Sequence, residues 1–249
     1  MKYQRTYTGE DGHTHFEEVD VPYTVERGQG RETDLLPAAS IHFRVTPGTM
    51  NYSFHTAPRR RLIVMLSGAL EVETGLGEKR QFRAGDVLEV GDTHGHGHIS
   101  RALGGEDFRS TFINLDDELV SDRRTGLESC EAGMEVIRCR TGADGQSHFS
   151  DDRLPFVHES PSGRTTAELP LKGFQFVLKP PIFDRDFHNA PQRQVLLCLT
   201  GGINVEVGDG TQRTVEVGDI YFGEDDDGQG HISRALNGLE RISIFAHLA

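Results

Sequence analysis

The feature that most constrains the fold is a repeat, because adding 133 to a residue number in the first half of the chain gives its counterpart in the second half. The run Phe-His-Thr-Ala-Pro at 54–58 returns at 187–191 as Phe-His-Asn-Ala-Pro. About 44 of 116 aligned positions are identical with no gap, which chance does not produce over that length. We therefore expect two like domains, 1–116 and 134–249, joined by a polar linker at 117–133.

Short strand-like runs dominate each copy. Apolar or alternating residues fill 61–66 and 69–74 in the first copy and 195–199 and 203–207 in the second, and glycine-rich turns divide them. Runs of this length at roughly 8–12 residue spacing are typical of an antiparallel sandwich or barrel. The fold class is therefore predicted to be all-β, and the best helical segment is a short one at 116–124.

Composition limits the partners. A net charge of −13 argues against nucleic acid and against an anionic membrane surface. No apolar run approaches the roughly 18 residues of a membrane span, and no signal peptide is visible. The cysteines Cys130, Cys139 and Cys198 are odd in number and form no metal-type pair, which favours reduced thiols and a cytoplasmic protein.

The order strand, Gly, strand, Gly-Asp, strand, Gly-x-Gly-His resembles the cupin superfamily over nearly the whole chain. His55 and His188 fall at the first histidine of the first cupin motif, and His98 and His231 match the histidine of the second. Gly68 and Gly201 close the first motif, while Gly85-Asp86 and Gly218-Asp219 open the second. The resemblance implies two tandem cupin barrels of the double-stranded β-helix or jelly-roll type, related by internal duplication: a bicupin.

The metal motif is degenerate in both copies. Alanine stands at the second histidine position, and the glutamate position holds Arg61 in the first copy and Gln194 in the second. The second copy therefore offers His188, His231 and the weak amide ligand Gln194. Transition metals in proteins usually take three or four side-chain ligands.

The first copy offers more imidazoles. His94, His96 and His98 alternate with glycine, so an extended strand would place them on one face. With His55 from another strand they could form a site for iron, nickel, manganese or zinc, and we expect no organic cofactor. The alternatives are a surface loop that binds metal adventitiously and histidines that only hydrogen-bond in the core.

The first copy has two arginines close to the position of its first motif histidine. Arg59 and Arg61 alternate with Ala57 and should share the face of His55. A buried guanidinium requires an anion, either a protein carboxylate such as Glu71 or Glu73 or a carboxylate or phosphate on a ligand. His55, Arg61 and Tyr52 are the catalytic candidates in this copy. Tyr221 is a further candidate for proton transfer in the second copy.

Three functions stay open. The first is a metal-dependent enzyme of oxygenase, lyase or isomerase type, with its main site in the N-terminal barrel. The second is a metal-free epimerase, dehydratase or cyclase that uses histidine as a general base. The third is a small-ligand binding or sensor protein without turnover. All three predict a small-molecule ligand, for which a compound with a carboxylate group is the candidate, and the chain is expected to form a homodimer.

Overall fold

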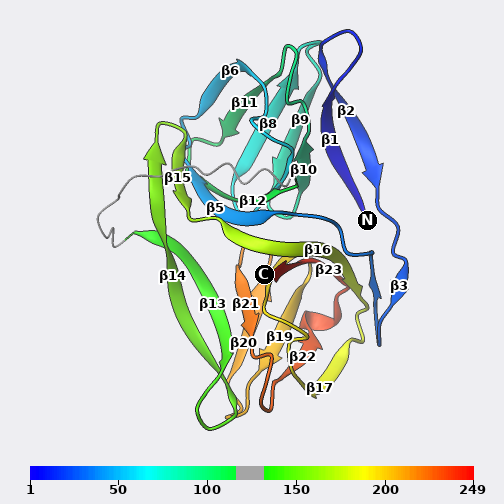
Figure 1. Cartoon of the computed structure of the whole chain (residues 1–249), viewed down its shortest axis with the longest axis vertical. Coiled ribbons are helices and arrows are strands. Elements are labelled where there is room, and N and C mark those ends of the chain that lie inside the picture. Colours follow the sequence, from blue (N-terminus) through cyan, green and yellow to red (C-terminus); the bar gives the residue numbers. More distant parts are fainter. Residues whose placement is uncertain (116–131) are drawn as a thin grey trace. The chain divides into compact units, whose positions relative to one another are not determined.

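The computed structural model describes residues 1–115 and 132–249 and consists almost entirely of β-strands (Figure 1). The linker, the helical segment predicted at 116–124 and Cys130 lie wholly or mainly outside the described residues. Within the described part, the one helical element is a 3-10 turn, η1 (Leu236–Gly238), and no helix has the length and apolarity needed to cross a bilayer.

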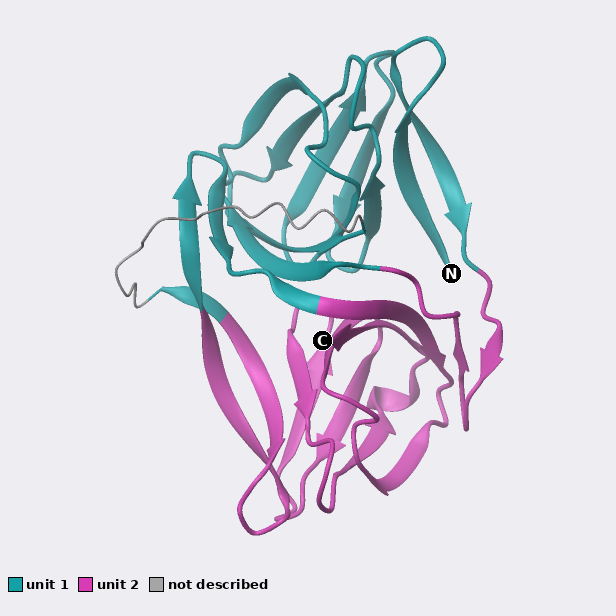
Figure 2. Ribbon diagram, in the orientation of Figure 1, with its two compact units in different colours: residues 1–21, 38–134, 155–170 teal, residues 22–37, 135–154, 171–249 magenta. Residues whose placement is uncertain are grey.

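The chain divides into two compact units (Figure 2). Unit 1 comprises residues 1–21, 38–134 and 155–170, and unit 2 comprises 22–37, 135–154 and 171–249. Each unit follows one repeat for most of its length but includes one segment of the other repeat. The domain boundaries drawn from the repeat alone remain a prediction.

Unit 1 contains two sheets. Its larger sheet has the order β2 (Thr14–Asp20), β1 (Lys2–Thr8), β10 (Val87–Val90), β7 (Arg61–Met65), β12 (Phe108–Asn114), β5 (Ser40–Thr46), β15 (Gly163–Thr166) and the last residues of β14 (Ser147–Ser160). Its smaller sheet has the order β6 (Asn51–His55), β11 (His98–Leu103), β8 (Ala69–Thr74) and β9 (Lys79–Arg83).

Unit 2 repeats this arrangement. The first residues of β14 are followed by β13 (Gly133–Thr141), β21 (Tyr221–Glu224), β18 (Gln194–Thr200), β23 (Arg241–Leu248), β16 (Leu169–Lys179), β4 (Arg31–Glu32) and β3 (Val25–Glu26). Its smaller sheet has the order β17 (Asp184–His188), β22 (His231–Ala235), β19 (Gly202–Glu206) and β20 (Gln212–Glu216).

Apolar side chains from both sheets of a unit meet inside it. Met65 of the larger sheet and Val72 of the smaller sheet belong to one buried cluster in unit 1, and Leu196 and Val205 do so in unit 2. Strands of a half-buried sheet alternate between core and outside, as β8 does, which is why the period of two was visible in the sequence. The predicted all-β class with a closed barrel is confirmed.

A hairpin is exchanged between the repeats. In unit 2, Glu32 of β4 pairs with Val177 of β16, so a segment of the first repeat extends the sheet of the second. In unit 1, Arg164 of β15 pairs with Val45 of β5, which is the reciprocal arrangement. Each unit therefore receives side chains from the other repeat, and these reach the sites described below.

Candidate functional site

A pair of histidines occupies the same place in each unit. His55 of β6 lies opposite His98 of β11 in the antiparallel register, and His188 of β17 lies opposite His231 of β22. The two ring centroids are 4.5 Å apart in both pairs. The sequence motif thus places two imidazoles side by side in each barrel.

The glycine before the second histidine is required by close packing. Gly97 and Gly230 have φ values of +79° and +77°. A Cβ at these positions would lie 2.2 Å from the carbonyl oxygen of His55 and 2.1 Å from that of His188. The Gly-His sequence therefore allows the two histidine-bearing strands to approach each other.

A buried aspartate orients the second histidine of each pair. Oδ2 of Asp92 lies 2.6 Å from Nδ1 of His98, and Asp225 repeats this contact with His231. Asp225 also accepts a hydrogen bond from Ser147 Oγ at 2.8 Å. A carboxylate on Nδ1 holds the N–H there and leaves Nε2 for a ligand or a proton.

The first histidine of each pair donates its Nδ1–H to a backbone carbonyl. The acceptors are the carbonyl oxygens of Ser53 for His55 and of Asp186 for His188, both at 2.8 Å. Burial lowers the pKa of His55, and burial together with His231 lowers the pKa of His188 to about 4. Both rings are therefore neutral at pH 7.

His94 and His96 are placed differently from His98. Both are exposed, and the ring of His96 packs against Phe54 at 4.0 Å and His13 at 5.3 Å between centroids. The residues run through two glycines with positive φ rather than along one strand, so they do not share the face of His98 as an extended strand would. Within the described residues they form no ligand group with His55 and His98.

Arg61 of unit 1 lies in a cationic environment. Its pKa falls to about 10 because of burial and the neighbouring Arg44 and Arg59, and Glu168 acts in the opposite direction. Its guanidinium stacks on Phe112, with Cζ 4.7 Å from the ring centroid, and its buried Nε has no hydrogen-bond partner among the described residues.

The carboxylate in this cluster is not one of those expected from the sequence. Glu71 and Glu73 pair instead with Lys79 and Arg101, so the expectation that they partner Arg61 is wrong. Glu168 comes from the other repeat and pairs with Arg59. The repeat comparison could not reveal it, because residue 35, its counterpart, is a leucine.

Tyr52 lies next to the catalytic candidate His55, with ring centroids 5.4 Å apart in an edge-on arrangement. Its hydroxyl is buried beside the guanidinium of Arg44. Tyr221 of unit 2 is fully buried beside the Cys139 thiol, and burial raises its pKa well above the ordinary value. A hydroxyl held in its neutral form can donate a proton or a hydrogen bond but is a poor base.

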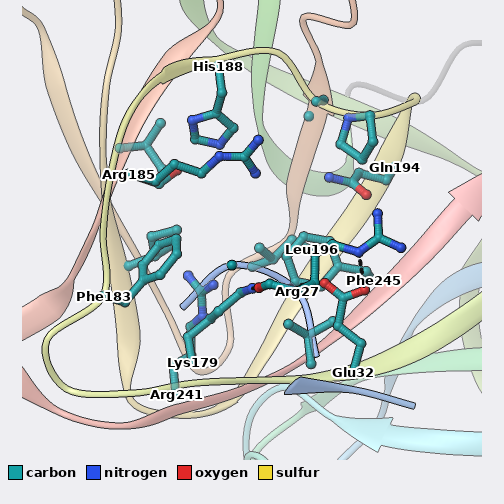
Figure 3. A pocket seen from close by; sticks show the side chains of 18 of the residues that line it. Arg27, Glu32, Lys179, Phe183, Arg185, His188, Gln194, Leu196, Arg241 and Phe245 are labelled. Carbon is teal, nitrogen blue, oxygen red and sulfur yellow. Dashed lines mark hydrogen bonds and ion pairs between the residues drawn. The ribbon is translucent and has the colours of Figure 1, made fainter. Parts of the chain in front are cut away.

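Unit 2 contains a cavity of about 650 Å³ lined by both histidines of its pair (Figure 3). Gln194 also lines it, and the buried Oε1 atom of this amide has no hydrogen-bond partner among the described residues. Leu196 and Phe245 contribute apolar surface. Cavities of this size and mixed polarity are typical of small-molecule sites.

Charged residues that the motif comparison did not single out line the same cavity. They are Arg27, Glu32, Lys179, Asp184, Arg185 and Arg241, and Asp184 pairs with Arg234. Two of them, Arg27 and Glu32, belong to the hairpin exchanged from the first repeat and form an ion pair at 2.9 Å. Nothing in the sequence of the second repeat signals that these two residues belong to its site.

The resemblance in fold implies a metal, and a metal requires several donor groups close together. Among the described residues, one group of three potential ligands lies close together: Cys139, Asp225 and His231. In this group Asp225 is already bound to His231 Nδ1, and burial together with Asp225 raises the pKa of the Cys139 thiol to about 12. In the structure these side chains form a hydrogen-bonding network around Asp225, which binds His231 and accepts a hydrogen bond from Ser147.

The histidine pairs themselves fall short of a metal site. In unit 1 the cation Arg61 stands where the motif has a carboxylate ligand, and in unit 2 the neutral Gln194 does. Two imidazoles with at most one amide oxygen do not match the three or four nitrogen, sulfur or carboxylate ligands of transition-metal sites. The residues present therefore do not fit the metal that the resemblance implies.

No protein-family model and no curated protein matches this sequence. Several solved structures are similar in fold at low identity. A cupin 2 conserved barrel domain protein from Leptotrichia buccalis is 14% identical, with a TM-score of 0.44 over 93% of this chain and 98% of that one. A protein of unknown function from Pseudomonas syringae is 11% identical, with a TM-score of 0.36 over 100% of both chains.

An oxalate decarboxylase variant from Bacillus subtilis is 15% identical, with a TM-score of 0.32 over 92% of this chain and 76% of that one. At these identities the comparisons concern the fold and not the activity. The proteins to which this chain is similar in structure are cupin-domain proteins.

Proposed function

We propose that this protein is a metal-free, two-barrel enzyme that binds a small molecule in unit 2 and transfers a proton to or from it. The observation that carries the proposal is that His188 and His231 both line the cavity of about 650 Å³. A pocket that brings a few polar groups together is the default candidate for a binding or active site.

His231 is the general base in this proposal. The Asp225 carboxylate on its Nδ1 stabilises the imidazolium that forms when Nε2 takes a proton from a carbon of the ligand. The electron pair of the broken C–H bond stays on the ligand until a proton returns, as in isomerisation or epimerisation. His188 remains neutral beside it, since its pKa is about 4, and orients the ligand.

The proposal moves the main site from the first repeat to the second. The N-terminal location was expected because of the histidines at 94 and 96, which lie exposed on the surface. The cavity in unit 2 and the charged residues that line it support the C-terminal barrel instead. Unit 1, with the same histidine pair and aspartate, provides a matched internal control.

Deuterium exchange tests the proposal. The full chain is incubated in D2O with a panel of small molecules that carry an acidic carbon–hydrogen bond, and incorporation is followed by mass spectrometry. We expect incorporation into at least one compound, a loss of roughly 100-fold or more in His231→Gln, and no loss in His98→Gln. Equal exchange in wild type and His231→Gln, or none with any compound, would overturn the proposal.

Metal-dependent chemistry with iron, nickel, manganese or zinc is the second candidate. It is favoured by the unpartnered Oε1 of Gln194 in the cavity beside the histidine pair. Elemental analysis of untagged protein after reconstitution distinguishes the candidates. We expect well below one equivalent of metal and exchange that survives chelation, whereas one tightly held equivalent that chelation removes together with activity would favour the metal-dependent candidate.

A further inference from the structure

Arg241 is a buried cation that lines the cavity of unit 2. Its residue is only 2% exposed, and its Nε and Nη1 atoms have no hydrogen-bond partner among the described residues. Buried polar atoms in proteins are nearly always hydrogen-bonded, and a buried charge is costly unless it meets an opposite charge. Arg241 is therefore a group whose requirement for an anion the described protein atoms do not meet.

A second cation lies directly opposite. Lys179 of β16 is the register partner of Arg241 of β23, and its side chain is 12% exposed. Both face Phe183, with Lys179 Nζ 5.4 Å and Arg241 Cζ 5.7 Å from the centre of the ring. Like charges opposite each other in a sheet are destabilising, so the folded chain holds this pair at a cost to stability.

The nearest carboxylate does not neutralise the pair. Glu32 is 3.9 Å from Lys179 Nζ but already binds Nε of Arg27 at 2.9 Å. Among the residues that the structure describes, the group that would favour the charged form of Arg241 is the Cys198 sulfur. Burial raises the pKa of this thiol to about 11, so it is neutral at pH 7 and does not balance the charge. A positive charge is left over at this end of the cavity.

The barrel scaffold does not require these cations. The counterparts of Lys179 and Arg241 in the first repeat are Thr46 and Phe108, which are neutral, although that repeat forms the same sheets. A charge pair present in one barrel and absent from its structural equivalent is a feature of the site and not of the fold.

We infer that Arg241 and Lys179 form an anion subsite, which binds a carboxylate or phosphate group of the ligand in unit 2. Figure 3 shows both side chains on the side of the cavity away from His188. Leu196 and Phe245 line the cavity as well, so the ligand class is a small molecule with an anionic group and an apolar or planar body. This inference rests on the proposed function for its choice of site, and it names the ligand class.

Calorimetric titration of the full chain tests the subsite with benzoate, phenylphosphonate and inorganic phosphate, and with benzyl alcohol as the neutral analogue. We expect one of the aromatic anions to bind at least roughly tenfold more tightly than benzyl alcohol, because a hydrogen bond to a charged group is worth that much. The better of benzoate and phenylphosphonate identifies the anion. Binding of inorganic phosphate alone, or equal affinity for the alcohol, would overturn the inference.

Two variants locate the binding. Lys179→Met should weaken binding of the preferred anion roughly tenfold, whereas Lys79→Met on the exposed face of unit 1 should not change it. Arg241→Met removes a buried cation without a partner, so it should raise the melting temperature while it weakens binding. Unchanged affinity in both Lys179→Met and Arg241→Met would contradict the subsite.

The same titration in His231→Gln separates this inference from the proposed function. If the anion binds normally to His231→Gln and to wild type but no deuterium is exchanged by either, the subsite stands and the proton-transfer proposal fails. If deuterium is exchanged and neutral compounds bind as tightly as anions, the proton-transfer proposal stands and the inference of an anion subsite fails.

Discussion

Oδ2 of Asp225 lies 2.6 Å from Nδ1 of His231, and Asp92 and His98 repeat this distance in the other barrel. Both aspartates are 0% exposed. The repeated contact belongs to the common scaffold, while what surrounds it differs between the barrels. The effect of this contact on stability and its effect on catalysis can therefore be tested separately by making the same substitution in both units.

Asp225→Asn replaces a buried carboxylate with an amide that can also hydrogen-bond but has no charge. We expect a loss of about 2 kcal/mol in the free energy of unfolding, because hydrogen bonds to charged groups contribute roughly 1.5–3 kcal/mol. Asp92→Asn should cost a similar amount, whereas only Asp225→Asn should slow proton exchange. Urea denaturation measures the first effect, and identical exchange rates in the two variants would count against a role for Asp225 in catalysis.

The low pKa of His188, about 4, makes stability depend on pH. Above the ordinary value of about 6.5 the ring is neutral in both the folded and the unfolded chain. Between about 6.5 and 4 the unfolded chain takes up a proton that the folded chain does not, so stability falls as the pH falls through this window.

His188→Asn should flatten that part of the stability curve relative to wild type, and the exposed His158→Gln should leave it unchanged. Thermal unfolding of metal-free protein at a series of pH values gives both curves. The reading of His188 as a buried neutral ring is wrong if His188→Asn and wild type lose stability in parallel from pH 6.5 to 4.

Glu224 is a buried carboxylate that contacts Arg138, Arg140 and Arg193. These guanidinium groups outweigh the effect of burial and lower its pKa to about 2. A depressed carboxyl pKa stabilises the fold above the ordinary value of about 4.5, and this stabilisation is lost as the pH falls from there to about 2.

Glu224→Gln should destabilise the chain by about 2 kcal/mol at pH 7, since it weakens the hydrogen bonds of a carboxylate to three guanidinium groups, although buried Arg138 keeps Asp152 as a partner. The difference from wild type should shrink as the pH is lowered below 4.5. Glu135→Gln, at a glutamate whose side chain is 76% exposed, is the control and should change little. Chemical denaturation at pH 7 and pH 3 measures the free energy of unfolding of each variant. A difference between Glu224→Gln and wild type that is the same at both pH values would contradict the prediction.

Glu168 and Arg61 should respond in opposite ways to neutral substitution. Glu168→Gln removes the carboxylate that faces Arg59 and Arg61, so we expect a loss of about 3 kcal/mol. Arg61→Gln introduces the residue of the second repeat and relieves repulsion from Arg44 and Arg59, so its effect should be small or stabilising. Equal losses in the two variants would show that Arg61 is satisfied as it stands.

The all-β fold class could be predicted because strands and turns have recognisable local sequence patterns. A strand shows a period of two, as in 69–74, and glycines mark the turns that end each run. Both patterns are present in each of the two repeats. The glycine of Gly97-His98 has a local cause as well, since a Cβ there would strike the backbone of the neighbouring strand. Pairing of His55 with His98 was expected from their positions in the two motifs that resemble those of cupins.

The site was harder to predict because its charges come from distant segments. Glu168 reaches the arginines of unit 1 from the second repeat, and Glu32 reaches Lys179 of unit 2 from the first. No spacing rule connects such residues. Arg241 could not be predicted for another reason, because it belongs to no recognised motif. The available signal was that its counterpart in the first repeat is an apolar residue, Phe108.

A crystal structure of the full chain with benzoate would show whether unit 2 binds an anionic small molecule between Arg241 and the histidine pair. We expect the carboxylate within about 3 Å of a guanidinium nitrogen of Arg241, with the ring directed toward His188 and His231. Benzoate bound elsewhere, or a cavity without benzoate at a concentration that saturates the protein in solution, would contradict it.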